Sequence, residues 1–427
     1  MINKLILGFC LGYPHMTVQS EMKTIAYIAP EIPALSATFV YNEVLGLEGK
    51  GFDVVPISVH VPSTLVKEDR VAALASRVHY LYAESILSLL LANVIILFCT
   101  PLNFIKILFT VLGDVLRVGL SNRIGLGLLY RFFVASRVAV ILKNNKCFHL
   151  HAHFAHVPTD IAMYAALLAD IPFSFTSHAN DLFERGWLLP QKITRSQFAV
   201  TISEFNKEYL CSLGGDGEKI HVVRCGVNSD TFAARPFNPC TPPYTIGTLG
   251  RMVEKKGFDI LLRAAMILHE NNVEFELLIA GSGPLEDYLK KLSQQLALDR
   301  VVYFVGSLPH KDVPPWLKTL DLFVLPCQKD KNGDMDGIPV VLMEAMLSGI
   351  PVVSTKLSGI PELIGHGKEG ILAEPKSPES LASAIWRLLD DDALQCKCVG
   401  SGVEKVEKEF DAESNIKKII KLFEKGT

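Results

Sequence analysis

The sequence predicts an α/β protein built from two Rossmann-like, doubly wound domains that face each other across a cleft, with an apolar helical insertion in the N-terminal domain. Three observations support this fold class. Short apolar segments of strand length alternate with longer helical patterns along most of the chain. The 427 residues are enough for two or three domains. A cluster of prolines separates two alternating series and predicts a linker: Pro236, Pro239, Pro242 and Pro243.

The first 21 residues form an extension whose role the sequence leaves open. Lys4 followed by the apolar run Leu5–Leu11 resembles a weak signal peptide, but no convincing cleavage site follows. The alternative is an extension that precedes a natural start at Met22, because a buried strand is predicted directly after that residue. We favour the second interpretation.

Residues 22–235 are expected to form the N-terminal domain. A helix is predicted from about Thr38 to Lys50, and Ser36 is a plausible N-cap for it. The strands predicted for this domain are Thr24–Ile28, Phe52–Val59, Cys147–His153, Phe173–Ser177, Phe198–Ile202 and His221–Arg224. Strands that alternate with helices indicate a parallel sheet.

A long apolar insertion at residues 85–143 interrupts this domain, and the mean hydropathy of the chain, +0.29, is high for a soluble enzyme. Ser85–Ile105 carries no charge and has about the length of a membrane span, but Pro101 interrupts it. Basic residues follow among apolar ones: Arg123, Arg131, Arg137 and Lys143. Such helices often lie in a membrane surface. Surface contact is therefore favoured, while buried core helices and a true span remain as alternatives.

After a linker at residues 236–243, residues 244–410 are expected to form the second domain, and residues 411–427 a C-terminal helix that packs back on the first domain. The predicted strands are Thr245–Leu249, Phe275–Ala280, Val301–Phe304, Leu322–Leu325 and Val352–Ser354. The predicted helices lie near Gly257–Glu270, Pro284–Leu296, Val340–Ser348 and Ser377–Leu389. Doubly wound domains bind ligands beyond the carboxyl ends of their strands, so a ligand is expected in the cleft.

The composition excludes several classes of protein. With 42 Lys and Arg against 45 Asp and Glu, the net charge of −3 provides no basic excess for binding nucleic acid. The 49% hydrophobic content excludes a largely disordered chain. The nine cysteines are odd in number and scattered, without a CxxC motif, which indicates reduced thiols in the cytoplasm.

Two loops of the second domain have the composition of a phosphate site. Arg251 and Lys256 lie between a strand and a helix, where two cations suit a diphosphate, although a solvated basic loop is the commoner explanation for such a pair. Gly281 and Gly283 follow the next strand, and glycines there let a ligand approach the backbone. This motif is not the dinucleotide fingerprint, because Glu286 replaces the third glycine.

The most specific stretch is Asp334–Met346. Asp336 falls in a loop and could hold a sugar hydroxyl, while Glu344 lies about two turns along the following helix and could accept hydrogen bonds from both ribose hydroxyls. Between them, exposed backbone N–H groups could bind phosphate or sugar oxygens. The residues that open this helix are Gly337, Ile338, Pro339 and Val340.

Histidines of the first domain are a second group of candidates. His178 ends a predicted strand, where it could contact a reacting sugar, although a lone histidine there is more often structural. His149, His151 and His153 alternate on one face of another strand and suggest a metal. Because no carboxylate or cysteine completes a set at close spacing, packing is the favoured interpretation.

Together these motifs resemble the retaining nucleotide-sugar glycosyltransferases of family 4, which have the GT-B fold. The resemblance rests on GR-x4-KG at Gly250–Gly257, on GSGP at Gly281–Pro284 and on D-x7-E from Asp336 to Glu344. It extends from about Met22 to Phe423. The looser motifs of the first domain, which include Pro33–Phe39, His178 with Asp181, and Gly226–Asn228, are most similar to those of exopolysaccharide enzymes of the colanic-acid type.

The resemblance implies a metal-independent hexosyltransferase that moves a sugar from a nucleotide-diphosphate-sugar, a co-substrate, to an acceptor hydroxyl, without a cofactor. It assigns the second domain to the donor and the first to the acceptor. The residues implied in catalysis are His178, Asp336, Arg251 and Lys256. The donor-binding residues would be Ser36, Arg251, Lys256, Gly281, Gly283, Gly306, Leu308, Asp336, Gly337, Ile338, Pro339, Val340 and Glu344, with Gly306 and Leu308 near the base.

Two departures from the family pattern concern the donor sugar: Asp336 stands where Glu is usual, and Ala37 replaces the Glu of a usual SET sequence. A DxD metal site at Asp334 and Asp336 is disfavoured by its context. A calcium loop there fails because Met343 occupies its last ligand position. No metal is therefore expected.

The apolar, basic insertion suits a lipid-linked saccharide as acceptor, at an anionic surface on the inner face of the plasma membrane. Two other classes of function remain open. One is a GT-B nucleotide-sugar epimerase, which would release a free product. The other is an inactive sugar-binding scaffold, against which the joint presence of Arg251, Lys256 and Glu344 argues.

Overall fold

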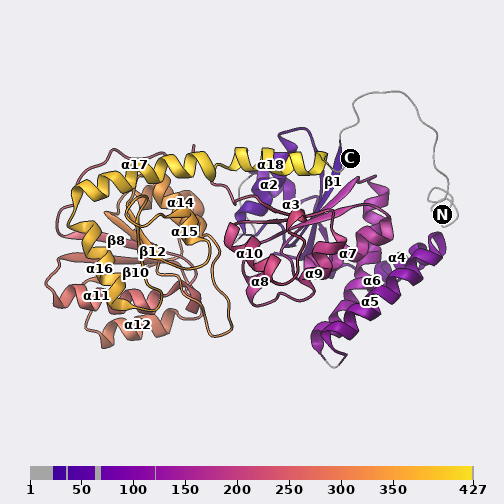
Figure 1. Ribbon diagram of the computed structural model, residues 1–427, viewed down its shortest axis with the longest axis horizontal. Helices are drawn as coiled ribbons and strands as arrows, with labels where there is room; N and C mark the ends of the chain where they lie inside the picture. The colour runs from indigo at the N-terminus through magenta and orange to yellow at the C-terminus, as the bar shows by residue number, and fades with distance from the viewer. Residues whose placement is uncertain (1–22, 35–36, 63–68, 121, 426–427) are drawn as a thin grey trace. The chain divides into compact units, whose positions relative to one another are not determined.

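The computed structural model describes residues 23–34, 37–62, 69–120 and 122–425 (Figure 1). The uncertain N-terminal extension and Ser36 lie outside the described residues. The chain divides into two compact units. Unit 1 contains the chain up to Thr201, Lys207–Val222 and the chain from Ile416, and unit 2 contains Ile202–Asn206 and Val223–Asn415.

Unit 1 is built on a seven-stranded sheet in the order β3-β2-β1-β4-β5-β6-β7, and every strand pair is parallel. The strands are β1 (Thr24–Glu31), β2 (Asp53–His60), β3 (His79–Tyr80), β4 (His149–His153), β5 (Phe173–Ser177), β6 (Phe198–Thr201) and β7 (Ile220–Val222). The order reverses between β1 and β4. The edge strand β3 was absent from the prediction, because two half-buried residues carry no apolar pattern.

The helices of unit 1 are α2 (Thr38–Glu48), α3 (Asp69–Ala75), α4 (Ile86–Cys99), α5 (Pro101–Val118), α6 (Arg123–Asn144), α7 (Val157–Ala169), α8 (Asn180–Phe183), α9 (Leu189–Arg195) and the end of α18 (Ala412–Glu424); α10 (Glu204–Ser212) begins in unit 2 and ends in unit 1. The core joins the sheet to α6 and α7. It contains the fully buried aromatic rings of Phe132, Tyr164, Phe173 and Phe175.

The apolar insertion forms α4, α5 and α6, and no continuous helix covers Ser85–Ile105. The chain bends by 117° between α4 and α5. Pro101 explains the break, because proline lacks an N–H for the preceding helix but fits the first turn of the next. The helix α6 is long and apolar enough to cross a membrane by length and composition, yet 56% of its most apolar window is buried inside the structure. Its apolar side chains therefore serve largely as core.

Two arginines that were expected to contact lipid form internal ion pairs instead. Arg131 Nη1 lies 2.9 Å from Oδ2 of Asp160 on α7, and Arg137 Nε lies 2.8 Å from Oε1 of Glu84. Asp160 is fully buried and also binds Nζ of the fully buried Lys192 at 2.8 Å. Removing one member of a buried ion pair leaves an uncompensated charge and costs about 3–5 kcal/mol. The expectation that Arg131 and Arg137 lie free at a membrane surface was therefore wrong.

A second buried carboxylate attaches α5 to the body of unit 1. Asp114 has no solvent exposure, and it accepts hydrogen bonds from the guanidinium of Arg195 on α9 at 2.5 and 2.8 Å. The hydroxyl of Tyr164 on α7 donates to the same carboxylate at 3.0 Å. The insertion is therefore attached to α7 and α9 by charged and polar contacts as well as by apolar packing. These contacts define the inner face of the insertion, which packs against the rest of unit 1.

Unit 2 has a six-stranded parallel sheet in the order β10-β9-β8-β11-β12-β13. The strands are β8 (Tyr244–Leu249), β9 (Phe275–Ala280), β10 (Val302–Gly306), β11 (Leu322–Val324), β12 (Val352–Thr355) and β13 (Ile371–Ala373). The order again reverses beside the first strand, between β8 and β11. The short edge strand β13 was not predicted, while β9 has the bounds that were expected for it.

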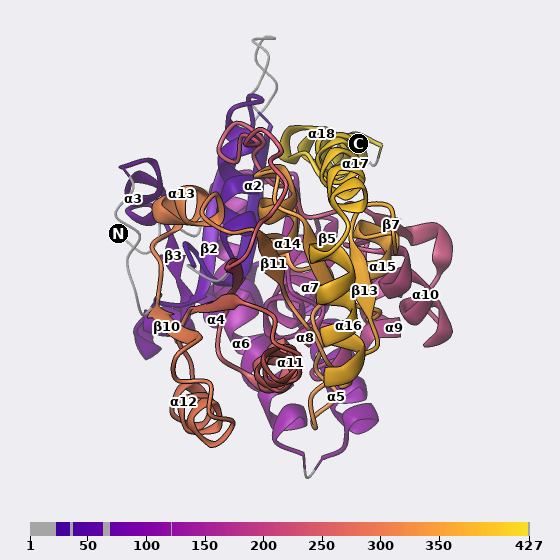
Figure 2. The same ribbon diagram turned by 90° about the vertical axis from the view of Figure 1, so that its left-hand side faces the viewer.

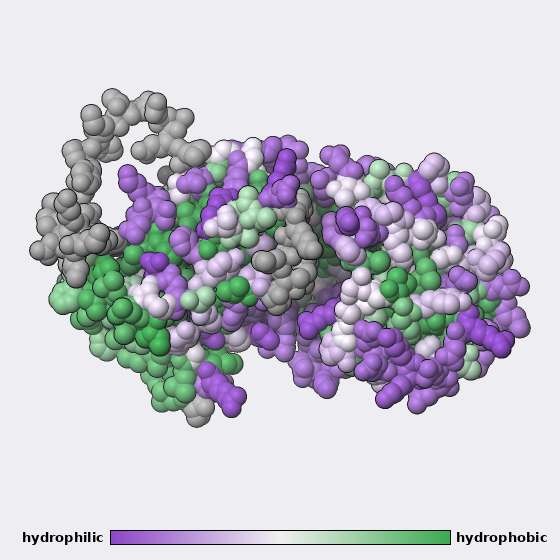
Figure 3. Space-filling view, turned by 180° about the vertical axis from the view of Figure 1, so that it is seen from behind, coloured by the Kyte–Doolittle hydropathy of each residue, from purple (hydrophilic) through white to green (hydrophobic). Residues whose placement is uncertain are grey.

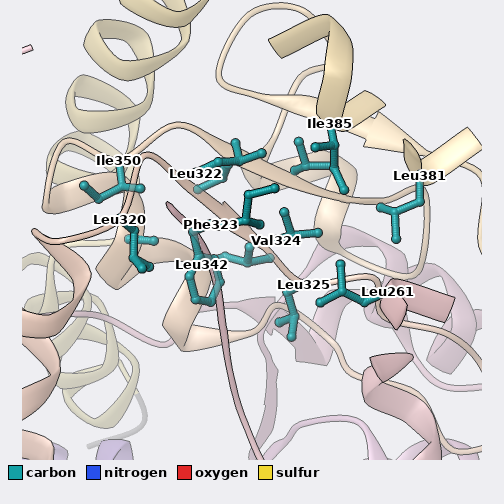
Figure 4. Close-up of a cluster of buried hydrophobic side chains, with 14 of the residues drawn as sticks. Leu261, Leu320, Leu322, Phe323, Val324, Leu325, Leu342, Ile350, Leu381 and Ile385 are labelled. Carbon is teal, nitrogen blue, oxygen red and sulfur yellow. The ribbon is translucent and has the colours of Figure 1, made fainter. Parts of the chain in front are cut away.

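The helices of unit 2 are α11 (Phe258–Glu270), α12 (Glu286–Gln295), α13 (Val313–Leu317), α14 (Val340–Leu347), α15 (Ile360–Leu363), α16 (Pro378–Leu389) and α17 (Asp392–Glu409). The helices α11 and α16 lie side by side (Figures 1 and 2). The central strand β11 is fully buried, and Figure 4 shows its side chains among leucines and isoleucines of the surrounding helices. The predicted class, two Rossmann-like α/β domains, is confirmed.

The strand β4 places three histidines inside unit 1 rather than on its surface. His149 Nε2 and His151 Nδ1 each lie 2.7 Å from the hydroxyl of Ser174, and His151 Nε2 lies 2.9 Å from the hydroxyl of Thr176. The ring of Phe423 from α18 packs against His149, with 5.1 Å between the ring centres. Neighbouring hydroxyls thus provide partners for the rings of His149 and His151, as buried polar groups require.

Acid should destabilise unit 1 in particular. Burial lowers the pKa of His149 and of His156 to about 3 and lowers that of His151 and His178 well below its usual range. The unfolded chain therefore binds more protons below pH about 6.5, and unfolding becomes easier as the pH falls, by up to ~1.4 kcal/mol per pH unit for each histidine. The histidines of unit 2 are all exposed: His269, His310 and His366.

Urea titrations at pH 7.5 and 5.5 would measure this effect. A variant with Trp316→Phe and Trp386→Phe keeps Trp187 as the fluorescent reporter of unit 1, and a Trp187→Phe variant reports unit 2. The urea midpoint should fall with pH more for unit 1 than for unit 2. Equal falls in the two variants would show that the buried histidines do not control acid stability.

Candidate functional site

The candidate residues of unit 2 follow four strands that are neighbours in its sheet. The loops that leave the carboxyl ends of β10, β9, β8 and β11 begin after Gly306, Ala280, Leu249 and Val324. Between β8 and β11 the strand order reverses, so the loops after these two strands lead to opposite faces of the sheet. In open α/β sheets this point is where ligands bind.

Hydrogen bonds join the two loops at this point. The backbone N–H of Gln328, after β11, donates to the carbonyl oxygen of Lys255 at 2.9 Å, and Nε2 of Gln328 donates to the carbonyl oxygen of Glu254 at 2.8 Å. Glu254 and Lys255 belong to a short 3₁₀ turn, η3 (Glu254–Lys256), after β8. The two loops therefore form one connected structure at the edge of the sheet.

Two lysines and two aspartates form ion pairs across these loops. Lys256 Nζ lies 2.7 Å from Oδ2 of Asp336, and Lys255 Nζ lies 2.9 Å from Asp334 and 3.5 Å from Asp336. Burial opposes the charge on Lys256, but the neighbouring Asp336 outweighs it and raises the pKa of the ammonium. Burial likewise opposes ionisation of Asp336, and Lys256 and Lys255 nevertheless lower the pKa of its carboxyl group. Lys256 and Asp336 are therefore both charged at neutral pH.

A buried cysteine completes this cluster. Cys327 Sγ lies 3.4 Å from Oδ2 of Asp336, and burial raises the pKa of its thiol well above the usual value. The thiol therefore keeps its proton and donates a hydrogen bond to the carboxylate of Asp336. Neither Lys255 nor Cys327 was predicted from the sequence. The adjacency of Lys255 to Lys256 was a usable signal, but nothing in the sequence indicated that Cys327 meets Asp336.

Arg251 differs from Lys256 in its surroundings. Its side chain is exposed, while the side chain of Lys256 is only 15% exposed. Within the described part of the chain, the Arg251 guanidinium has no hydrogen-bond partner. The two cations therefore lie in the same loop but differ in freedom: Arg251 can move toward an anion, and Lys256 is held by Asp336.

The glycines that were expected to admit a ligand also admit a neighbouring loop. A Cβ at Gly281, whose φ is +119°, would overlap the carbonyl oxygen of Gly250, and a Cβ at Gly283 would meet the backbone of Met252. This close approach is fixed by a hydrogen bond from Met252 N to Ser282 O at 2.9 Å. Gly281 and Gly283 thus bring the loops after β8 and β9 together.

Gly306 and Leu308 occupy the loop after β10. Gly306 has a φ of +81°, and a Cβ there would meet nothing within 4 Å, so it borders open space. Leu308 is partly buried against the core of unit 2. Ser307, between them, donates from its hydroxyl to Ser282 Oγ at 2.8 Å. This contact places the loop after β10 beside the loop after β9.

The helix α14 carries the second carboxylate of the D-x7-E motif. The side chain of Glu344 is 11% exposed, and its Oε1 lies 3.6 Å from Nε2 of His310, a residue that the sequence analysis did not single out. Pro339 is the N-cap and provides no capping side chain. The first N–H groups of a helix have no partner within the helix, and those of Val340 and Val341 are in this position. Ile338, just before the helix, is buried in the core.

His178 lies in unit 1, after β5, and is therefore not in the same unit as the other candidates. Its backbone N–H donates to Asp181 at 3.0 Å, and its ring packs against Phe39 and Phe154, each with 4.6 Å between ring centres. Burial first, and then the nearby His153 and His156, lower the pKa of His178 well below its usual value. The ring is therefore neutral at pH 7.

A carboxylate does lie beside the histidines of β4. The possible ligand atoms of Glu43, His151 and His153 lie within 4.8 Å of one another, so the spacing argument against a metal was incomplete. The sequence hid this group because Glu43 is on α2, 110 residues before His153. These atoms already have hydrogen-bond partners: Tyr27 donates to Glu43 at 2.8 Å, and both nitrogens of His151 contact hydroxyl groups.

Comparisons with known proteins identify the family of the chain. Residues 109–231 match the family model described as Glycosyltransferase Family 4, and residues 231–404 match the model described as Glycosyl transferases group 1. The amylovoran biosynthesis glycosyltransferase AmsK of Erwinia amylovora is 29% identical over 94% of this chain and 99% of its own length. A putative colanic acid biosynthesis glycosyltransferase of Escherichia coli K12, WcaL, is 38% identical over 56% of this chain and 57% of its own length.

Solved structures show the same fold. A glycosyltransferase from Rickettsia africae aligns with a TM-score of 0.68 at 17% identity, over 95% of this chain and 98% of its own. Anabaena HepE in complex with UDP aligns with a TM-score of 0.69 at 16% identity, over 95% of this chain and all of its own. The chain therefore belongs to the glycosyltransferases of the GT-B fold, with a family 4 domain followed by a group 1 domain.

Proposed function

We propose that this glycosyltransferase moves a sugar from a nucleotide-diphosphate-sugar to an acceptor hydroxyl, with retention, in the synthesis of an exopolysaccharide or another surface polysaccharide. The names of AmsK and WcaL support the pathway class, and the UDP bound to HepE supports a nucleotide-sugar donor. The observation that carries the proposal is the grouping of Lys256, Asp336 and their loops where the strand order of unit 2 reverses.

The proposed donor site follows the geometry of unit 2. Arg251 and Lys256 bind the diphosphate, and Glu344 binds the ribose hydroxyls. Asp336 binds the donor sugar together with the backbone from Gly337 to Val340. Because Lys256 is paired with Asp336 in the free protein, the lysine is held in place before the donor binds. Gly306 and Leu308 lie near the base, and His178 of unit 1 contacts the reacting sugar.

The proposed mechanism follows from the charges that develop. Cleavage of the anomeric C–O bond leaves positive charge on the sugar and negative charge on the diphosphate. Arg251 and Lys256 stabilise the diphosphate as it leaves. The acceptor hydroxyl attacks the anomeric carbon from the face that the diphosphate leaves, so that the configuration is retained. Its proton passes to the leaving phosphate oxygen.

Loss of either cation should slow transfer. Arg251→Ala and Lys256→Ala each remove a charge-assisted contact that contributes about 1.5–3 kcal/mol, so kcat/KM should fall at least tenfold. The two variants should differ in stability, because Lys256 is buried against Asp336 while Arg251 is exposed. Steady-state kinetics with a panel of nucleotide sugars, and thermal unfolding, measure both effects. Arg263→Ala, an exposed arginine on α11, is the control.

Near-wild-type turnover in both variants would place the diphosphate elsewhere. A folded Arg251→Ala variant that loses activity, beside a Lys256→Ala variant that loses both activity and stability, would support the two roles. Failure of the wild-type protein to transfer from any nucleotide sugar, whatever the acceptor, would contradict the proposed function itself.

We further propose that transfer needs no metal. Asp334 and Asp336 face the ammonium groups of Lys255 and Lys256 at 2.7–3.5 Å, and these cations already occupy the positions in which a divalent ion would neutralise the two carboxylates. Activity should therefore be unchanged by excess EDTA. Loss of activity in EDTA that added Mn²⁺ or Mg²⁺ restores would show that the aspartates are a metal pair.

A membrane-associated acceptor is proposed from the outer face of the insertion. Figure 3 shows hydrophobic residues gathered over the end of unit 1 that contains α4, α5 and α6. The outer apolar face is defined by its exposed residues: Ile86, Leu87, Leu90, Leu91, Val94, Leu97, Phe98, Leu102, Ile105, Phe109, Leu112, Leu116, Leu120, Leu126, Tyr130 and Phe133. Patches of this extent on a monomer mark interaction sites.

Exposed basic residues accompany the outer apolar face, namely Lys106, Arg117 and Arg123. Such residues attract anionic headgroups, while the apolar side chains enter the acyl boundary. We therefore propose that the enzyme is cytoplasmic, lies on the inner face of the plasma membrane as a peripheral protein, and takes a lipid-linked saccharide as acceptor.

Liposome binding should depend on the outer apolar face. The protein should sediment with anionic vesicles more than with neutral ones, and high salt should release part of it, because each basic residue contributes about 1 kcal/mol that salt screens. Leu102→Ser with Phe109→Ser, at sites that are 84% and 69% exposed, should weaken binding without unfolding the protein. The combination of Lys106→Glu and Arg123→Glu should weaken binding to anionic vesicles only.

The control is Leu213→Ser, an exposed leucine of unit 1 outside the outer apolar face. Arg131 and Arg137 are avoided, since reversal of their charges would disrupt internal ion pairs. A wild-type protein that stays in the supernatant with every lipid mixture would contradict the membrane proposal. Extraction from cells only by detergent would instead support a spanning segment.

A further inference from the structure

Asp336 contacts three groups, and one of them, Lys255, has no role in the proposed donor site. Oδ2 of Asp336 lies 2.7 Å from Nζ of Lys256 and 3.4 Å from Sγ of Cys327. Oδ1, the other oxygen, lies 3.5 Å from Nζ of Lys255. The side chain of Asp336 is only 14% exposed, so these neighbours replace most of the water around its charge. The two lysines thus approach different oxygens of one carboxylate.

In the proposed function, Lys256 interacts with two anions. It pairs with Asp336 in the free protein, and it binds the diphosphate when the donor is present. A lysine that is drawn to a diphosphate gives less stabilisation to the carboxylate that it leaves. A buried charge without its partner destabilises a protein strongly. A second cation beside Asp336 prevents this loss, and Lys255 lies on the side of the other carboxylate oxygen.

Asp334 holds the ammonium group of Lys255 in this place, with 2.9 Å between Oδ2 and Nζ. Asp334 is itself fixed by Asp330. Its backbone N–H donates to Oδ1 of Asp330 at 2.9 Å, and its carbonyl oxygen accepts from the backbone N–H of Asp330 at 2.9 Å. The same loop is attached to η3, because the backbone N–H of Lys331 donates to Oε1 of Glu254 at 3.2 Å. Lys255 is therefore held from both loops.

From these contacts we propose that Lys255 and Asp334 are positioning residues of the donor site. Asp334 holds the ammonium group of Lys255 beside Asp336, so that Asp336 keeps a cationic partner when Lys256 moves to the diphosphate of the donor. The proposal rests on the proposed function, because it takes Lys256 as a ligand of that diphosphate. All of these residues belong to unit 2.

The electrostatics of the cluster agree with this role. Burial opposes the charge of Lys255, but Asp336 and then Asp334 raise the pKa of its ammonium group, which therefore stays charged at neutral pH. Burial likewise opposes ionisation of Asp336, while Lys256 and then Lys255 lower the pKa of its carboxyl group. Lys255 thus stabilises the ionised form of Asp336 in the free protein, before a donor binds.

Stability alone does not explain the contact between Lys255 and Asp334. Asp334 is 7% exposed, and its Oδ1 is buried without a hydrogen-bond partner among the described residues. A buried polar atom without a partner destabilises a folded protein. Because the ammonium group of Lys255 faces Asp336 as well, it leaves this oxygen of Asp334 without a donor. The arrangement therefore favours Asp336 over complete hydrogen bonding of Asp334.

Calorimetric binding of nucleoside diphosphates tests this role without an acceptor. The probes are UDP, GDP and ADP, and the one that binds the wild-type protein most tightly is used for the variants. Lys255→Met should weaken its binding roughly tenfold or more, because Lys256 can then leave Asp336 only by leaving a buried charge unpaired. Asp336→Asn removes that charge, so in its background Lys255→Met should change the Kd by no more than about threefold. Such suppression is specific to a lysine that acts through Asp336.

Conservative variants provide the rescue. Lys255→Arg keeps the charge and should restore most of the affinity. Asp334→Ala should weaken binding as Lys255→Met does, while Asp334→Asn keeps an oxygen that accepts from Lys255 and should bind like the wild type. Thermal unfolding establishes that each variant is folded. If Lys255→Met does not fold, Asp334→Ala with and without Asp336→Asn makes the same test. Lys291→Met, the same change at an exposed lysine of α12, is the control.

The outcomes separate the positioning role from the proposed function. Wild-type affinity in the folded Lys255→Met and Asp334→Ala variants would overturn the positioning role. A loss of affinity that Asp336→Asn does not suppress would also overturn it, because Lys255 would then bind the diphosphate directly or only hold the loop. A wild-type protein that binds none of the three nucleotides would contradict the proposed donor site, and the positioning role with it.

Discussion

The parallel sheet, with its strand order reversed beside the first strand, is the constraint on which the rest of this structure depends. In unit 2 the reversal between β8 and β11 brings the loop of Lys256 against the loop of Asp336. In unit 1 the reversal between β1 and β4 brings α2, with Glu43, against the end of β4, with His153. Both groups of polar residues lie where helices leave a parallel sheet in opposite directions, which is where the backbone leaves room for a ligand.

The ion pairs of a charged residue distinguish residues that stabilise the fold from residues that remain available to a ligand. Arg131 and Arg137 form ion pairs with Asp160 and Glu84, and substitution of either arginine would lower the stability of unit 1. Lys256 is also paired, but with Asp336 at the edge of the sheet, and in the proposed function an anionic donor shares this cation. Among the cations of that loop, only Arg251 is exposed, and it has no side-chain partner among the described residues. A single type of interaction thus provides anchoring in one unit and preorganisation in the other.

The insertion of unit 1 has an inner face that packs against the unit and an outer face that is exposed. Its inner face is fixed by Asp114 with Arg195 and by apolar packing of α6 on α7, so the position of its three helices is determined by the core. Its outer apolar face has no such partners within the described residues, and it is too extensive for an ordinary solvated surface. The ion pairs and the apolar packing that hold the inner face against unit 1 therefore also determine which apolar side chains point outward.

The sequence alone determined the fold class and the local motifs, because apolar runs, glycines and D-x7-E are properties of neighbouring residues. Buried strands such as Phe173–Ser177 were predicted with their correct bounds, while the short edge strand Ile371–Ala373 was not predicted, since three residues show no periodicity. The tertiary structure alone decided which charges meet. Glu43 approaches His153 across 110 residues, and Arg131 finds Asp160 on another helix. A carboxylate or guanidinium looks the same in sequence whether it is paired or free, because the partner is chosen by packing and by the cost of burying a lone charge.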